Sequence, residues 1–245
     1  MTSMTSAVAT PADQSTTRCG LAIFVKTPPL SAVKTRLAVD LGRTAAERLY
    51  LASAQAVASV AEQAQTYADI RAYWAVAEHA AVGTPQWPVF SHLAQGNGSL
   101  GERMATIYRT VREHHCAAIL IGADAPQLSA QLLSKAAEWL AADTPRYVMG
   151  RACDGGFWLF GGNTAIAGSA WTRPKYSRPD TADRFVQSIA EIGQWLELDV
   201  LRDIDTVDDI APTLHALHSL AAPTSEQLRL AQILDSVDYS PAVAS

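Results

Sequence analysis

Long hydrophobic runs and runs of basic residues are both missing from this sequence of 245 residues. No apolar segment approaches the roughly 20 residues that a membrane-spanning helix needs, so we do not expect a membrane partner. The chain has 19 Lys and Arg against 24 Asp and Glu, and its basic residues form no run that could follow a nucleic-acid backbone. Any cationic binding site must therefore be local.

Cysteine is scarce, with three residues far apart at Cys19, Cys116 and Cys153. None belongs to a CxxC motif or has a histidine at zinc-like spacing, which argues against a disulfide framework and a structural zinc. The residues up to Arg18 lack the charged start and the apolar core of a signal peptide. We therefore expect a cytoplasmic protein with three free thiols.

A linker rich in Pro, Gly or Ser is also absent from the middle of the chain, whose composition is ordinary for a globular protein. We predict one domain over residues 19–235, with a disordered tail at 1–18 and a second tail at 236–245. Short apolar runs alternate with helical patterns throughout this domain. The alternation predicts an α/β fold: a mainly parallel sheet, helices on both faces and a ligand crevice at the carboxyl ends of the strands.

The predicted strands share a short apolar run bounded by turn residues. They are residues 20–25, 70–76, 117–121, 147–150, 157–160 and 195–200. Most helix starts are marked by a capping box, in which Ser or Thr stands three residues before an acidic residue. The predicted helices begin at Thr44, at Ser99 (to about 115), at Ser129, at Ser177 (to about 192), at Thr206 (to about 220) and at Pro223.

The segment KTPPLSAVKTRL, residues 26–37, places three cations in and just beyond the loop after the first predicted strand. In an acidic protein, Lys26, Lys34 and Arg36 at a crevice edge favour an anionic ligand. Phosphate suits them best, because lysine supplies a point charge and arginine a planar fork. The alternative is a solvated surface turn, which describes most short basic clusters.

Two aspartates near the ends of later strands are candidate metal ligands. Asp124, in GADAP after the 117–121 run, can bind Mg²⁺ together with phosphate oxygens. A role in capping the following turn accounts for it equally well. Asp205 directly precedes a predicted helix and is available to a metal, whereas Asp208 and Asp209 serve the dipole of that helix.

Two glycine-containing motifs add further candidates. Residues 96–101 match GxGxxG, a dinucleotide pattern that must follow a buried strand. Segment 87–95 is a poor strand, so we reject an NAD site, and Gly98 remains a candidate for close approach to a phosphate or base. Asp154, in the CDGG turn, is the candidate acceptor-binding residue or general base. An Asp-Gly turn joining two strands explains Asp154 as well.

Together these motifs resemble the nucleotide-diphospho-sugar transferase superfamily, which has the GT-A fold. The ordered segments AIFVKTPPLSAVKTRLA, QGNGSLGERM, IGADAPQL, DGGFWLFG and DIDTVDDI look most like the selenodomain-associated or arsenosugar-biosynthesis glycosyltransferases. This likeness covers about residues 20–215. The first segment also looks like the start of 2-phospholactate guanylyltransferase, and DGGFWLFG like its DGG turn.

The resemblance implies a transferase that uses Mg²⁺ or Mn²⁺, a nucleotide or nucleotide sugar, and a small-molecule acceptor. It makes Asp124 of the GxDxP motif a metal ligand, and it assigns the basic loop to the nucleotide phosphates. Asp205 matches the second metal aspartate of the manno-octulosonate cytidylyltransferases, with Val207 in place of a proline. The DxD motif of glycosyltransferases and the GxGxRM signature of nucleotidyltransferases are both absent here.

We therefore predict a Mg²⁺-dependent transferase with a single GT-A-like domain and with Lys34, Asp124 and Asp154 as its catalytic residues. The basic loop slightly favours nucleotidyl over glycosyl transfer, because three cations exceed what a diphosphate requires. The alternative is a non-catalytic nucleotide-binding or scaffold protein. Such a protein would bind nucleotide without needing Mg²⁺ and would release neither pyrophosphate nor a nucleoside diphosphate.

Overall fold

A seven-stranded sheet in the order β3-β2-β1-β4-β6-β5-β7 runs through the computed structural model, which describes residues 18–189 and 192–237. Neighbouring strands are parallel except that β6 runs antiparallel to both β4 and β5. The prediction of an α/β fold with a mainly parallel sheet is confirmed. The strands are β1 (Cys19–Val25), β2 (Ile70–Val76), β3 (Ser91–Ala94), β4 (Ala117–Gly122), β5 (Arg146–Ala152), β6 (Phe157–Gly162) and β7 (Gln194–Leu201).

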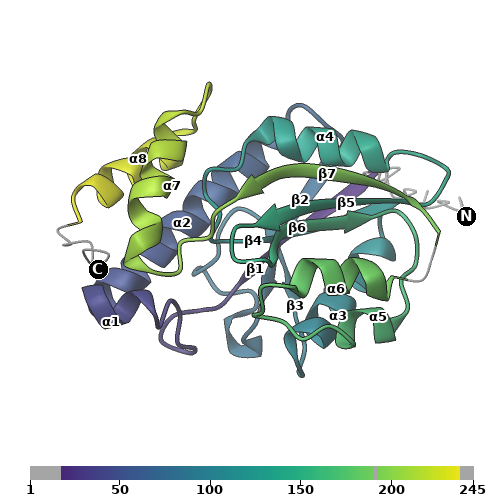
Figure 1. The fold of residues 1–245 in the computed structure, drawn as a ribbon, viewed down its shortest axis with the longest axis horizontal. Helices are drawn as coiled ribbons and strands as arrows, with labels where there is room; N and C mark the ends of the chain where they lie inside the picture. Colours follow the sequence, from purple (N-terminus) through teal and green to yellow (C-terminus); the bar gives the residue numbers. More distant parts are fainter. Residues whose placement is uncertain (1–17, 190–191, 238–245) are drawn as a thin grey trace, which may run out of the picture.

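Helices cover both faces of this sheet (Figure 1). Helices α2 and α4 lie on one face, α3, α5 and α6 lie on the other, and α7 and α8 pack beside α2. The α-helices are α1 (Leu37–Leu41), α2 (Arg43–Ala64), α3 (Leu100–Arg112), α4 (Ala130–Leu140), α5 (Gly168–Thr172), α6 (Thr181–Ser188), α7 (Ile210–His218) and α8 (Ser225–Asp235). Two short 3₁₀ helices are η1 (His79–Ala81) and η2 (Val207–Asp209).

The central strand β1 supplies apolar side chains to both faces because successive residues of a strand point in opposite directions. Leu21 and Ile23 belong to the core under α2 and α4, whereas Ala22 belongs to the core under α3 and α6. Strand β4 is also buried along most of its length. Because both faces of these strands are buried, their sequences are continuous apolar runs. Polar loops can therefore meet only at the strand ends, and in open α/β sheets the carboxyl ends form the ligand crevice.

Several predicted helix starts are confirmed. The side chain of Ser99 accepts a hydrogen bond from the backbone N–H of Glu102, and the carboxylate of Glu102 accepts one from the backbone N–H of Ser99. Thr206 and Asp209 form a second capping box, at the start of η2, and Ser129 caps α4. The predicted helix from Ser99 ends earlier than expected, at Arg112.

Two predicted starts are wrong. Helix α2 begins at Arg43, after Gly42, whose φ of 78° lets the chain turn sharply from α1 into α2. Thr44 therefore lies inside the helix. Ser177 lies outside α6, which begins at Thr181, and its φ of 60° places it in a turn. This helix ends at Ser188, short of the expected residue 192.

Most of the two predicted tails lies outside the described residues. Only Arg18 of the 1–18 segment and residues 236–237 of the second segment are described. The three cysteines are free, with Cys19 buried and the other two exposed. Within the described part of the chain, no helix combines the length and the apolar character that crossing a membrane requires.

Candidate functional site

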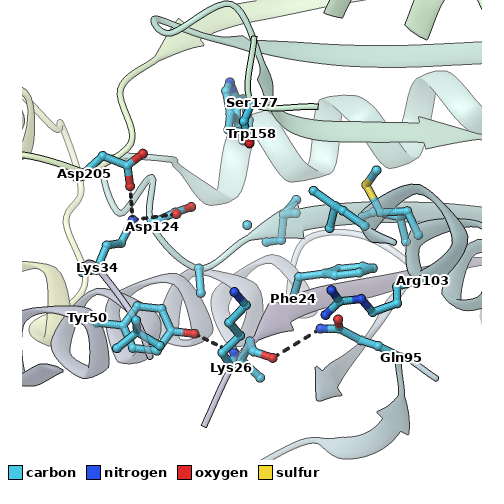
Figure 2. A pocket seen from close by; sticks show the side chains of 18 of the residues that line it. Phe24, Lys26, Lys34, Tyr50, Gln95, Arg103, Asp124, Trp158, Ser177 and Asp205 are labelled. Carbon is cyan, nitrogen blue, oxygen red and sulfur yellow. Dashed lines mark hydrogen bonds and ion pairs between the residues drawn. The ribbon is translucent and has the colours of Figure 1, made fainter. Parts of the chain in front are cut away.

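The carboxyl ends of β1 and β4 open into a cavity of about 560 Å³. One end of this cavity is charged and includes Lys34, Asp124 and Asp205, while Phe24, Gln95 and Arg103 lie at the other end (Figure 2). The volume is in the range of small-molecule sites in proteins. The predicted crevice at the strand ends is therefore present.

Lys34 lies between two aspartates at the charged end. Its Nζ is 2.8 Å from Asp124 Oδ2 and 2.6 Å from Asp205 Oδ1, and only 7% of its side chain is exposed. Burial by itself lowers the pKa of Lys34, but the charges and hydrogen bonds of the two carboxylates more than offset this and hold the pKa above its usual range. The lysine therefore remains an ammonium ion, and the three side chains form one ionic cluster.

Three loops from distant parts of the chain are tied together to build this cluster. In the loop after β4, the carbonyl oxygen of Asp124 accepts a hydrogen bond from the backbone of Ile204, after β7, at 3.0 Å. Gln127 donates to the carbonyl oxygen of Arg202 at 2.7 Å, which adds a second tie between the same two loops. On the other wall, Tyr50 of α2 accepts a hydrogen bond from the backbone N–H of Lys26 at 2.8 Å.

The backbone is unusual at two positions that line the cavity. Lys34 has a φ of 47° and Ser177 a φ of 60°, in the left-handed region that residues other than glycine rarely adopt. Such conformations persist where the surrounding contacts over-determine them, and they cluster at functional sites. The carbonyl oxygen of Lys34 accepts a hydrogen bond from the backbone N–H of Ala38 at 2.9 Å, and its Nζ contacts the two carboxylates.

Asp203 is a further acidic residue of this region, and the sequence analysis missed it as a site residue. Burial raises its pKa above the usual range, the charge of Asp124 adds to the rise, and Lys34 acts in the opposite direction. Its Oδ1 atom is buried without a hydrogen-bond partner. Its importance comes from burial beside other carboxylates, which sequence spacing alone does not reveal.

The other end, here called the apolar end, has the ring of Phe24 beside Arg103 of α3, and Leu100 and Met104 of the same helix also line the cavity. Gln95 lies beside them and donates its Nε2 hydrogens to the carbonyl oxygens of Val25, at 3.2 Å, and Ala75, at 2.8 Å. Because both donors are used, the amide orientation is fixed and its Oε1 is left as the acceptor. The sequence analysis missed Gln95 and Arg103.

Comparison with known proteins identifies the family. The profile of the family described as "Uncharacterized protein conserved in bacteria (DUF2064)" matches residues 42–178, more than half of the chain. The chain belongs to this family. The matched region contains Asp124, whereas Lys34 and Asp205 lie outside it.

No curated protein gives a significant match to this DUF2064 chain. Among solved structures, a protein from Desulfovibrio desulfuricans G20 provisionally described as a nucleotide-diphospho-sugar transferase is 23% identical, with a TM-score of 0.69. The match covers 88% of this chain and 96% of that one. A CMP:2-keto-3-deoxy-manno-octonic acid synthetase complexed with CTP is 10% identical, with a TM-score of 0.50, over 83% of this chain and 100% of that one. At these identities the likeness shows a shared fold, and the predicted GT-A-like fold is confirmed.

Five of the predicted site residues of the DUF2064 chain line one cavity. They are Lys26, Lys34, Arg36, Asp124 and Asp205. The structure thus brings the basic loop to both candidate metal ligands, although only Lys34 is in direct contact with them. The roles of these residues in binding remain predictions.

The other two predicted residues do not line this cavity. Gly98 has a φ of 107° and lies at the start of α3. Asp154 is exposed and accepts a hydrogen bond from the backbone N–H of Gly156 at 2.8 Å. A Cβ at Gly155 would lie 2.0 Å from the carbonyl oxygen of Pro179. The close approach that this glycine permits is therefore to the chain itself.

The description of residues 87–95 as a poor strand is wrong in part. Strand β3, Ser91–Ala94, does directly precede the glycine motif. However, β3 is an edge strand whose residues are exposed or only partly buried, so the motif does not follow the buried strand that a dinucleotide site requires. Gly101, the last glycine of the motif, serves packing, because a Cβ there would lie 2.1 Å from the carbonyl oxygen of Trp171.

Proposed function

We propose that the protein is a divalent-metal-dependent transferase that acts at the phosphates of a bound nucleotide or nucleotide sugar. The observation that carries this proposal is the convergence of Asp124 and Asp205 on one cation at the strand ends. Lys26 and Arg36 line the same cavity and supply positive charge beside this acidic pair. The shared fold with a CTP-binding synthetase supports the proposal without deciding the reaction.

The residues present fit a hard divalent cation, which binds oxygen ligands and typically takes one or two carboxylates together with phosphate oxygens and water. Asp124 and Asp205 would hold it, and near them lies the buried Oδ1 of Asp203, which has no hydrogen-bond partner. Across the described residues, no group of three or more His, Cys, Asp or Glu side chains is arranged to hold a metal by itself. The site is therefore suited to a metal that arrives with its phosphates. Bound there, the metal would offset charge on the transferring phosphate.

Different residues of the site are suited to different parts of the substrates. Lys26 and Arg36 have no ion-pair partner among the described residues, so they are available to phosphate oxygens. The apolar end, with Phe24, suits a nucleobase, because an aromatic ring can stack on its face. Asp154 is our candidate for holding the acceptor, since its carboxylate is exposed and its charge reaches Asp203.

The choice between the two chemistries rests on the number of cations. Lys34 is neutralised by two carboxylates in this structure, so Lys26 and Arg36 are the cations of the basic loop that remain to match a diphosphate, with Arg103 at the other end of the cavity. If Lys34 is released when nucleotide binds, three cations face the phosphates and a departing pyrophosphate is well stabilised. We favour nucleotidyl transfer to a small acceptor on this ground.

A screen of nucleoside triphosphates and nucleotide sugars by thermal shift, with and without Mg²⁺, tests the proposal. A ligand at a hundred times its dissociation constant stabilises by about 2.7 kcal/mol, so a binder should be evident. Asp124→Asn should abolish the Mg²⁺-dependent part of the shift, because a neutral amide is a poor magnesium ligand. Release of pyrophosphate or of a nucleoside diphosphate then identifies nucleotidyl or glycosyl transfer.

A metal-independent nucleotide-binding protein is the second candidate, because Lys34 already lies where a metal would bind. In that case the thermal shift would be the same with and without Mg²⁺, Asp124→Asn would leave it unchanged, and no product would form. That result would overturn the proposed function.

A further inference from the structure

We infer that Lys34 is the resident cation of the metal site, which competes with a divalent ion for Asp124 and Asp205 and must withdraw before the ion can bind. This inference rests on the proposed function, because it takes the two aspartates as the metal ligands. It adds that the ammonium group of Lys34 blocks the metal position until this side chain moves away.

The geometry of the ionic cluster is the first reason. Asp124 Oδ2 and Asp205 Oδ1 both contact the same Nζ atom, at 2.8 and 2.6 Å. A divalent ion bonded to either oxygen would lie against the ammonium group, where the two positive charges repel each other at short range and low solvent exposure. The ammonium and the metal therefore exclude each other.

The second reason is that a phosphate bound in the cavity offers Lys34 an alternative partner. An ammonium group has three N–H donors, and the two aspartates use two of them. Lys34 also lines the cavity that holds Lys26 and Arg36, so a phosphate bound by those cations can take the remaining donor. The flexible four-carbon stem of the lysine can follow the phosphate by rotation of the side chain.

Binding of Mn²⁺ alone, followed by the electron paramagnetic resonance signal of the free ion, tests this competition without activity. Lys34→Met should bind Mn²⁺ about tenfold more tightly than the wild type, or more, because the competing charge is gone. Lys26→Met is the matched control, since it removes an equal charge from the same cavity without touching the aspartates. It should change the affinity by less than about threefold.

A double variant, Lys34→Met with Asp124→Asn, separates the inference from the proposed function. Loss of the tighter binding in the double variant supports both. If Lys34→Met and Lys26→Met shift the affinity equally while Asp124→Asn weakens it, the metal site stands and the competition is overturned. If no variant binds Mn²⁺ alone, the competition is overturned, while a metal that arrives with its phosphates is still allowed. If Asp124→Asn changes nothing in any background that binds Mn²⁺, the metal site fails and the inference fails with it.

A measurement on the wild type tests the same inference without a variant, so a folding defect cannot affect the result. Labelling of lysines by an amine-reactive reagent, read by mass spectrometry, should be weak at Lys34 without metal because its ammonium is buried and paired. Saturating Mn²⁺ should increase labelling of Lys34 by about tenfold and leave the exposed Lys26 unchanged. Unchanged labelling of Lys34 with Mn²⁺ bound at Asp124 would overturn the inference.

Discussion

Asp209 is the residue that holds Asp205 in place. Its Oδ2 accepts hydrogen bonds from the backbone N–H groups of Asp205, at 3.0 Å, and Thr206, at 2.8 Å, and its Oδ1 accepts one from Arg202 at 2.9 Å. Burial raises the pKa of Asp209, but these hydrogen bonds more than offset the effect and lower its pKa below the usual range. A residue assigned from sequence to the helix dipole is thus also the anchor of a candidate metal ligand.

Replacing Asp209 by alanine should lower the free energy of unfolding by about 1–2 kcal/mol near neutral pH, because a capping side chain is lost. Since the folded-state pKa is depressed, this stabilisation is complete above the unfolded value of 3.8 and disappears as the pH falls through the folded-state pKa. Urea unfolding at neutral and strongly acidic pH measures the difference. Asp208→Ala, at an exposed neighbour, is the control, and an equal loss in both variants would contradict the prediction.

At the scale of elements, the turn between β5 and β6 is fixed by a backbone contact with the segment before α6. Gly155 has a φ of 87°, and a Cβ there would lie 2.0 Å from the carbonyl oxygen of Pro179. The carbonyl oxygen of Gly155 also accepts a hydrogen bond from the backbone N–H of Ala182 at 3.0 Å. This contact positions the loop that carries Ser177 over the cavity.

Gly155→Ala should therefore lower the free energy of unfolding by about 2 kcal/mol or more, through backbone strain and a clash that rigid backbone cannot relieve. Gly168→Ala serves as the control, because a Cβ at that position meets nothing within 4 Å. Denaturant midpoints measure both effects. A small loss at Gly155, similar to that at Gly168, would show that the turn is free to move away from Pro179.

The elements that sequence patterns predicted are those with a strong local signal. Strands β1 and β4 were found because burial on both faces makes them continuous apolar runs. Strand β3 was missed because its four residues, SHLA, are only half-buried at the sheet edge and show no clear pattern. Ser177 was misassigned because its spacing to Asp180 imitates a capping box, whereas the helix start is decided by the turn before Thr181.

At the scale of the whole molecule, the sequence predicted which charged residues share the cavity but not how they pair. Strand-end position placed Lys34, Asp124 and Asp205 at one edge of the sheet, and the structure has them there. Their direct contact depends on the path of three loops in space, which no local pattern encodes. The burial of Asp203 depends on the same loops and could not be predicted for the same reason.

The separation of the clustered residues along the chain makes the site a reporter of complete folding. Lys34 is 90 residues from Asp124 and 171 residues from Asp205, so the cluster forms only after the long-range loops close. In refolding, helix content measured by far-UV circular dichroism should recover before the burial of Lys34 measured by pulsed amine labelling. Simultaneous recovery would mean that the sheet and its carboxyl-end loops assemble in one step. An intermediate that is helical yet unable to protect this lysine would be a molecule with the right elements and an unfinished topology.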